Sequence, residues 1–324
     1  MKAAVRTRYG PPDVVRVVEV EKPAAKDNEV LVRVHATTVN RTDCGLRAAK
    51  PFIYRFFLGL RRPRLTVLGN EFAGQVEAVG AGVTSFEVGD RVFGFSGTLF
   101  GAHAEYLTMP TDGMLATMPA DLSYEEAAPC TEGSLYALSL IRTAKLRSGQ
   151  GVLVNGGTGA IGSAAVQLLK DTGAVVTAVC GTEHMELVRS LGADRIIDYT
   201  AEDFTRDGQR YDVVLDAVGK SSFGRCRRLL KPGGLYLSTD LGPLSQNPVL
   251  ALVTPLFGGR RVRFPIPRQD QGTVAYLKER IESGALKPLI DRRYRLDQIV
   301  EAYRYVETGR KVGSVVVSVD PGNG

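Results

Sequence analysis

The pattern of apolar and polar positions divides the chain into a β-rich first part and an alternating second part. Short β-branched or glycine-bounded runs predict strands in the first part. These runs lie at residues 3–5, 14–20, 30–34, 76–79, 91–95, 102–109 and 113–118. Between them, residues 42–49 suit one short helix. The pattern therefore predicts an antiparallel, barrel-like β domain with little helix.

The pattern changes near residue 123. Ser123 and Glu126 have the spacing of a capping box, and a helical pattern runs from there to residue 144. Strands and helices then alternate, with strands expected at 152–154, 175–179, 195–198, 212–216 and 235–239, and helices at 161–171, 184–191 and 221–230. This alternation predicts a doubly wound parallel sheet with helices on both faces.

The alternation fades after Val262. Two helical patterns, at 273–283 and 296–308, lead to a last expected strand at 314–319. Because no alternating register is left, we expect this tail to return to the first domain. The sequence thus predicts one β-rich domain from residues 1–123 and 262–324, with a dinucleotide-type domain inserted at 124–261. A cofactor is then expected in the cleft between the two domains.

One glycine-rich turn carries the strongest chemical signal. It follows the buried run at 152–154 and opens a helix, which is the context that a G-x-G-x-x-G motif requires. Its residues are Gly157, Thr158, Gly159, Ala160, Ile161 and Gly162. The glycines allow a tight turn, and the helix N-terminus offers unpaired N–H groups to a pyrophosphate. The turn predicts a dinucleotide site, with a purely structural turn as the alternative.

Composition restricts the class of protein without changing this picture. The chain has 324 residues, 44% of them hydrophobic and 23% charged, with a formal net charge of +6. Apolar runs are too short for a membrane span and the first residues too polar for a signal peptide, so we expect a cytoplasmic protein. Basic clusters without interleaved aromatics give no sign of nucleic-acid binding. The cysteines, which lack the short spacings of disulfide frameworks or zinc knuckles, are Cys44, Cys130, Cys180 and Cys226.

Residues 51–64, PFIYRFFLGLRRPR, form an irregular segment that is dense in aromatics and arginines. The segment is too irregular for a strand and too short to cross a bilayer. Two interpretations stay open: a flexible cap over a substrate pocket, and a peripheral contact with a membrane interface.

Along essentially its whole length, the chain resembles the medium-chain dehydrogenase/reductase superfamily. The resemblance rests on the β-rich first part, the glycine turn, LGNEFAGQVEAVGAGVTSFEVGDRVFG at 68–94 and GRKVGSVVVSV at 309–319. The pattern at 68–94 is far more specific than the glycine motif. The resemblance implies an α/β fold in which a GroES-like β-rich domain carries an inserted Rossmann-type doubly wound parallel sheet. It also implies a homodimer.

Two positions separate the zinc and zinc-free branches of this superfamily. The zinc branch has a Cys and a His in C-x-x-D and G-H-E motifs, where this chain has Asn40 and Asn70. Asparagine is a poor zinc ligand beside thiolate, imidazole or carboxylate. The chain is therefore more similar to the zeta-crystallin-type quinone oxidoreductases and the zinc-free enoyl reductases, and we expect no metal site. A zinc alcohol dehydrogenase with a rearranged site that uses Cys44 is the alternative.

The end of the second strand in the alternating part bears on the choice of cofactor. It reads Cys180-Gly181-Thr182 and lacks the carboxylate that holds the ribose 2′-OH of NAD. The Gly181 N–H, the Thr182 hydroxyl and His184 are candidate donors to a 2′-phosphate. Tyr199 matches a tyrosine that contacts this phosphate in quinone oxidoreductases. NADPH is the expected cofactor, although no Lys or Arg lies near His184, and NADH stays open.

The resemblance implies the remaining cofactor contacts. Asn40 and Thr131 match positions that line the nicotinamide. Loops after two later strands are expected to approach the cofactor, and their residues are Ala217, Val218, Gly219, Asp240 and Leu241. A structural role stays open for each of them, and Asp216 is also interpreted as a cap of the helix that follows it.

The expected chemistry follows from the missing zinc ligands. Without a Lewis acid an alkoxide is poorly stabilised, whereas a conjugated acceptor delocalises charge onto oxygen and needs only a hydrogen-bond donor and a proton. Candidate donors are Asn40, Tyr54 and Thr131; Tyr54 matches a tyrosine of related enoyl reductases, with plain packing as the alternative. We expect an NADPH-dependent reductase of an apolar quinone or α,β-unsaturated carbonyl. An NADPH-binding structural or regulatory protein with little turnover is the alternative.

Overall fold

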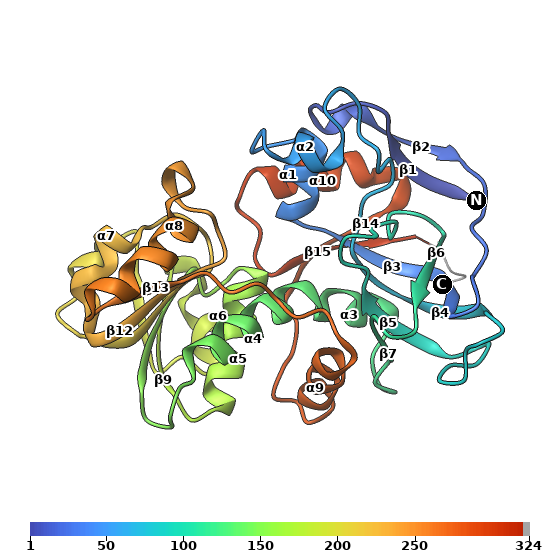
Figure 1. Ribbon diagram of the computed structural model, residues 1–324. Coiled ribbons are helices and arrows are strands. Elements are labelled where there is room, and N and C mark those ends of the chain that lie inside the picture. Colours follow the sequence, from blue (N-terminus) through green and yellow to red (C-terminus); the bar gives the residue numbers. More distant parts are fainter. Residues whose placement is uncertain (320–324) are drawn as a thin grey trace. The chain divides into compact units, whose positions relative to one another are not determined.

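The computed structural model describes residues 1–319, which form two compact units (Figure 1). Unit 1 comprises Met1–Glu132, Gln269–Glu282 and Pro288–Gly324, and unit 2 comprises Gly133–Arg268 and Ser283–Lys287. Residues 320–324, which the sequence analysis assigns to the β-rich domain, lie outside the described residues.

Unit 1 is built on a seven-stranded sheet with the order β14-β15-β3-β4-β5-β7, to which β6 is added beside β3. Its strands are β3 (Glu29–Val39), β4 (Glu71–Val79), β5 (Arg91–Phe95), β6 (Tyr106–Pro110), β7 (Met114–Thr117), β14 (Ile290–Arg295) and β15 (Ser314–Ser318). A second sheet pairs β1 (Lys2–Arg6) with β2 (Val15–Glu19). Strand β15 pairs antiparallel with β3, so the tail of the chain joins the sheet of the β-rich unit.

Capping boxes begin two helices of unit 1. The Asn40 side chain accepts a hydrogen bond from the Asp43 N–H, and the Asp43 carboxylate accepts one from the Asn40 N–H. Ser123 and Glu126 form the same reciprocal pair, which confirms the capping box predicted there. The helices of this unit are α1 (Arg41–Ala48), α2 (Tyr54–Leu58), α3 (Tyr124–Ala127), α9 (Gln271–Glu282) and α10 (Ile299–Glu307).

Unit 2 contains a six-stranded sheet whose strands are all parallel, in the order β10-β9-β8-β11-β12-β13. The strands are β8 (Gly151–Asn155), β9 (Val175–Cys180), β10 (Arg195–Asp198), β11 (Tyr211–Asp216), β12 (Leu230–Ser238) and β13 (Arg261–Arg263). Helices α5 (Ala160–Asp171) and α6 (Met185–Ser190) cover one face, and α7 (Phe223–Cys226) and α8 (Gln246–Val253) cover the other (Figure 1). The doubly wound parallel sheet is confirmed. Its strand order reverses between β8 and β11, which is where such sheets bind ligands.

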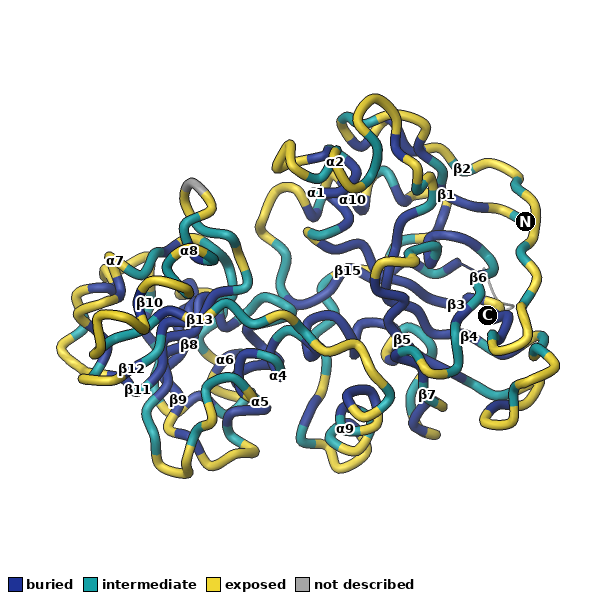
Figure 2. The backbone as a smooth tube through the Cα atoms, in the orientation of Figure 1, coloured by how far each residue is buried: buried dark blue, intermediate teal, exposed yellow. Residues whose placement is uncertain are grey.

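Burial explains where the sequence pattern succeeds and fails. Buried positions follow the strands of both sheets (Figure 2), and the buried runs are those that the sequence predicts well. The helix expected at 221–230 is confirmed in part: α7 is followed by a 3₁₀ turn at Arg227–Leu229, and Leu230 already pairs with Tyr211 as the first residue of β12. The strand expected at 102–109 begins only at Tyr106. The short α2, α8, β13 and the largely polar β14 are absent from the prediction, because none has a clear apolar period.

Candidate functional site

The glycine turn of unit 2 is packed closely at Gly157 and Gly162. A Cβ on Gly162, in the first turn of α5, would lie 2.0 Å from the Gly156 carbonyl oxygen. A Cβ on Gly157 would lie 3.2 Å from the Ala178 Cβ of β9. Gly159 is the N-cap of α5, and among the described residues no side chain caps the helix there. The N–H groups of its first turn, from Ala160 onward, thus suit an anionic group.

A buried carboxylate organises the loop that follows β11. Asp216 accepts hydrogen bonds from the Asn155 amide (3.0 Å), the Gly219 N–H (3.1 Å) and the Tyr236 hydroxyl (3.0 Å). Helix α7 is capped by Ser222 instead, so the interpretation of Asp216 as its cap is wrong. Asp216 holds the loop whose residues are Ala217, Val218 and Gly219.

Two further contacts place this loop in one cluster with the glycine turn. A Cβ on Gly156 would lie 2.3 Å from Val218 Cγ1, and a Cβ on Gly219 would lie 2.6 Å from Asp240 Cβ. Asp240 is fixed by its own turn, because its carboxylate accepts a hydrogen bond from the Gly242 N–H (2.8 Å). The structure therefore brings the predicted segments 157–162, 217–219 and 240–241 together at the carboxyl ends of the central strands.

A carboxylate of the neighbouring strand β10 lies beside the end of β9. Asp198 ends β10 in register with Cys180, and it accepts hydrogen bonds from the hydroxyls of Thr182 and Thr200. These bonds lower the pKa of the Asp198 carboxyl, so it is charged at neutral pH. Asp198 is absent from the predicted site residues, because only the pairing of β10 with β9 brings it to Thr182. The Thr182 hydroxyl is thus engaged, and Cys180 is buried.

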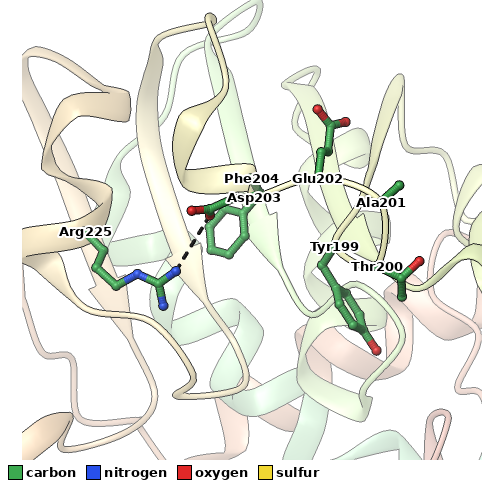
Figure 3. Close-up of a pocket in the computed structure, with 7 residues that line it drawn as sticks. All are labelled: Tyr199, Thr200, Ala201, Glu202, Asp203, Phe204 and Arg225. Carbon is green, nitrogen blue, oxygen red and sulfur yellow. Dashed lines mark ion pairs between the residues drawn. The ribbon is translucent and has the colours of Figure 1, made fainter.

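Tyr199 lies beside this strand end. A Cβ on Gly181 would lie 3.4 Å from the Tyr199 hydroxyl oxygen, while His184 lies 3.2 Å from the Glu183 carboxylate. A pocket of about 410 Å³ opens next to Tyr199 (Figure 3); its lining is Tyr199, Thr200, Ala201, Glu202, Asp203, Phe204 and Arg225. Arg225 points to Asp203, with which it forms an ion pair (3.7 Å). This guanidinium is therefore partly neutralised.

In unit 1, an amide pair occupies the place of the zinc ligands. Asn40 Nδ2 donates to Asn70 Oδ1 (2.9 Å), and Asn40 Oδ1 accepts from the Asp43 N–H (2.9 Å). Cys44 is buried in the core beside this pair, and burial raises the pKa of its thiol to about 12. Within residues 1–319, no group of three or more His, Cys, Asp and Glu side chains is arranged to hold a metal ion. The donor set does not fit zinc, which needs thiolate, imidazole or carboxylate ligands.

The Thr131 hydroxyl is directed into the protein. The residue is fully buried, and its hydroxyl donates to Glu71 Oε1 (3.1 Å) and lies 3.3 Å from the Gly94 carbonyl oxygen. Glu71 also accepts hydrogen bonds from the Thr38 hydroxyl (2.5 Å) and the Glu132 N–H (2.6 Å). Thr131 therefore orients Glu71 and does not present a donor to a ligand. Glu71 and Glu132 are buried acids that sequence reasoning missed.

Segment 51–64 packs one side against unit 1 and exposes the other. Tyr54 and Leu58 of α2 contact the core of unit 1, whereas Phe57 is 74% exposed. The other large apolar side chains exposed by this segment are Phe52, Ile53, Phe56 and Leu60. No helix within the described residues combines the length and apolar character that crossing a membrane requires.

Comparison with known proteins identifies the chain. Residues 26–120 match the alcohol dehydrogenase GroES-like domain, and residues 191–317 match the zinc-binding dehydrogenase domain. The chain is 34% identical to the 2-methylene-furan-3-one reductase of Solanum lycopersicum, over 99% of this chain and 80% of that protein. The chain belongs to the medium-chain dehydrogenase/reductase family. The chain is therefore an oxidoreductase of this family. The predicted fold, a GroES-like domain with a Rossmann-type parallel sheet, is confirmed.

Two further proteins are similar along nearly the full chain. The chain is 32% identical to the chloroplastic NADPH-dependent alkenal/one oxidoreductase of Arabidopsis thaliana, over 98% of this chain and 79% of that protein. The solved quinone oxidoreductase from Coxiella burnetii has a TM-score of 0.88 and 28% identity, and each chain is covered to 99%. The similarity to the zinc-free quinone oxidoreductases that the sequence indicates is thus confirmed.

Proposed function

We propose that this oxidoreductase transfers a hydride from NADPH to a quinone or an α,β-unsaturated carbonyl compound without a metal ion. The amide pair of Asn40 and Asn70 carries this proposal, because it replaces the ligands on which zinc-dependent alcohol chemistry relies. The relatives named for reduction of alkenals, enones and quinones support the same acceptor class.

The cofactor site is proposed for unit 2. The crowded turn 157–162 would hold the pyrophosphate, and the loops 217–219 and 240–241 would follow the dinucleotide toward the nicotinamide. NADPH, when bound, supplies the hydride. The Gly181 N–H, His184 and Tyr199 would contact the 2′-phosphate. Asp198 works against that contact, so the proposed preference for NADPH over NADH is modest.

The acceptor is proposed to be apolar. The exposed side chains of segment 51–64 offer an apolar surface flanked by arginines, which suits a cap over a hydrophobic acceptor or a peripheral contact with a lipid interface. The buried cysteines are free thiols, which supports a reducing compartment such as the cytoplasm. A homodimer is also proposed from the family likeness, and sedimentation would test it.

A panel of electron acceptors tests the proposed function. Purified protein should oxidise NADPH steadily with quinones and enones, and should oxidise simple alcohols with NADP⁺ much more slowly. A preference for NADH would refute the cofactor assignment, and faster alcohol oxidation would refute the acceptor class. Tight NADPH binding without turnover on any acceptor would favour a structural or regulatory protein.

Metal analysis is the second test. The protein should contain far less than one zinc ion per chain, and its activity should survive treatment with a chelator. A stoichiometric zinc ion whose loss abolishes activity would overturn the metal-free mechanism, whatever the acceptor.

A further inference from the structure

We propose that the carboxyl group of Glu132 is the proton source of the reduction and that the Thr42 hydroxyl delivers this proton to the acceptor. The inference deepens the proposed function, on which it rests, because a hydride acceptor of this class also needs one proton.

The two side chains form a direct link between a buried and a more open position. Thr42 Oγ1 lies 2.8 Å from Glu132 Oε1, to which it is hydrogen-bonded. Glu132 is the first residue of α4 (Glu132–Ala144) and is only 7% exposed, whereas Thr42 in the first turn of α1 is half-buried. Asn40 is the N-cap of α1, and Thr42 lies two residues later in the first turn of the same helix. The pair connects a buried acid with that helix start.

Other polar groups in this region are already engaged. The Asn40 amide caps α1 and pairs with Asn70, and the Thr131 hydroxyl donates to Glu71. The buried His103 ring contacts the Thr38 carbonyl oxygen (2.8 Å). The hydroxyls of Thr38 and Thr131, which also donate to an acid, Glu71, are fully buried, whereas Thr42 is only half-buried.

Hydrogen bonding decides which buried carboxyl group holds a proton. Glu71 accepts three hydrogen bonds, and Asp43 accepts two from the backbone N–H groups of Asn40 and Gly69. For Glu132, the contacts within the described residues give its carboxyl group one hydrogen bond, from Thr42. Burial raises the pKa of all three acids, and the hydrogen bonds that Glu71 and Asp43 accept oppose this rise. Because a carboxylate is stabilised by each bond it accepts, the negative charge is best placed on Glu71 and Asp43, and the proton on Glu132.

The electrostatic surroundings agree with this assignment. Burial, followed by the charges of Glu71 and Asp43, raises the pKa of Glu132 to about 8. Lys311, which precedes β15, opposes this rise, and its own pKa is lowered by burial. Arg41 and Asp291 act on Lys311 with opposite signs. Glu132 is thus protonated at neutral pH, with a cation near enough to stabilise the carboxylate that forms when the proton leaves.

The step balances in atoms and electrons. The acceptor gains two electrons with the hydride and becomes an oxyanion or enolate. For the transfer the Thr42 hydroxyl turns to donate to the acceptor and accepts from protonated Glu132, which reverses the direction of the hydrogen bond that joins the two side chains. The O–H bond of Thr42 breaks as a new bond forms between that proton and the acceptor, and the O–H bond of Glu132 breaks as Thr42 regains a proton. Glu132 is left as a carboxylate near Lys311 and takes a proton from water. One proton is consumed for each hydride.

Glu132→Gln tests the proposal, because glutamine keeps the size and a hydrogen bond to Thr42 but has no proton to give. We expect kcat to fall about 100-fold, within the usual range for loss of general acid catalysis, with NADPH affinity unchanged. In the wild type the rate should decline above about pH 8, since a general acid acts only while protonated. The rate of the variant should not show this decline at high pH. Glu87→Gln, an exposed acid of the same unit, is the matched control and should behave as wild type.

Variants at Thr42 keep the test independent of whether Glu132→Gln folds. Thr42→Ala should reduce kcat as Glu132→Gln does, and Thr42→Ser, which retains a hydroxyl, should restore most of it. Wild-type kcat and pH dependence in a folded Glu132→Gln variant, or in Thr42→Ala, would overturn the inference while leaving the proposed function intact.

Infrared spectroscopy of the protein without added acceptor supplies a readout besides activity. A carboxylic-acid C=O band should be present at pH 7, should vanish as the pH rises beyond about 8, and should be missing in Glu132→Gln. A wild-type spectrum with Glu132 ionised at pH 7 would refute the proton source. If no quinone or enone is reduced at all, the proposed function fails, and this band still reports the protonation of Glu132.

Discussion

The glycine turn of unit 2 and the carboxyl cluster of unit 1 are built by opposite physical means. The turn belongs to one continuous stretch, and its shape is fixed by excluded space at Gly156, Gly157 and Gly162. The cluster assembles Asp43, Glu71 and Glu132 from distant parts of the chain, and its shape is fixed by hydrogen bonds and charge.

This difference determines how each site responds to change. The turn has little room for an added atom at these glycines, but it is insensitive to pH because no group in it titrates. A buried carboxyl cluster tolerates isosteric exchange, but every unsatisfied oxygen or N–H group within it is costly. The comparison therefore predicts a sharp loss of ligand binding in unit 2 and graded losses of stability or rate in unit 1.

The largest effect is expected for Glu71→Ala. The substitution leaves the hydroxyls of Thr38 and Thr131 and the Glu132 N–H without their buried acceptor, so unfolding should require about 3–5 kcal/mol less free energy. Glu71→Gln keeps one oxygen acceptor and should lose less. Chemical denaturation measures both, with Glu87→Ala as the exposed control; a loss below about 1 kcal/mol for Glu71→Ala would show that the cluster is not held together by this residue.

Gly162→Val should abolish useful cofactor binding. Because a Cβ there would lie 2.0 Å from the Gly156 carbonyl oxygen, α5 and the turn must separate. We expect NADPH to bind roughly 100-fold more weakly, equivalent to about 3 kcal/mol. Calorimetric titration measures the change, and circular dichroism shows whether the fold is retained.

Gly208→Val is the control for this prediction, because a Cβ on Gly208 meets nothing within 4 Å in the described part of the chain. Unchanged NADPH binding by Gly162→Val would mean that the turn is only a structural link between β8 and α5.

The steric site is the one that sequence alone predicts well. Glycine spacing, the apolar run before it and the helical period after it are all local, so the turn, the parallel sheet and the loops 217–219 and 240–241 follow from short patterns. The polar edge strand β14 and the three-residue strand β13 are not predicted from the sequence. Each forms only because the folded chain places another strand beside it, and no local pattern shows this.

The electrostatic site depends on register and on long-range contacts. Asn40 and Thr131 are found from the family likeness, yet the bonds that occupy their polar atoms are visible only in three dimensions. Glu132 follows Thr131 directly in the sequence, but nothing local marks it as protonated; its pKa depends on Glu71 and Lys311. Asp198 escapes for the same reason, since only the pairing of β9 with β10 brings it to Thr182.

Asp198→Asn should sharpen the preference for NADPH. Removal of this exposed carboxylate ends its repulsion of a 2′-phosphate, so the ratio of NADPH to NADH affinity should rise about threefold at low salt and less at high salt. Asp203→Asn, which removes a carboxylate already paired with Arg225, is the control and should change the ratio less. A lower ratio in Asp198→Asn would place the 2′-phosphate elsewhere.

The smallest effect is expected for Tyr54→Phe, which separates packing from chemistry in segment 51–64. Tyr54 is half-buried against the core of unit 1, and its ring Cε2 would lie 3.5 Å from a Cβ on Gly45. The ring therefore packs against α1 and helps to hold α2, so kcat and NADPH affinity should stay within about twofold of wild type when the ring is kept, the scale of a surface change. Tyr54→Ala removes the ring, loosens α2, and should raise KM for apolar acceptors while NADPH affinity stays constant. If Tyr54→Phe lowers kcat at unchanged NADPH affinity, the hydroxyl donates to the acceptor, and the acceptor site extends from the Thr42 helix start to α2.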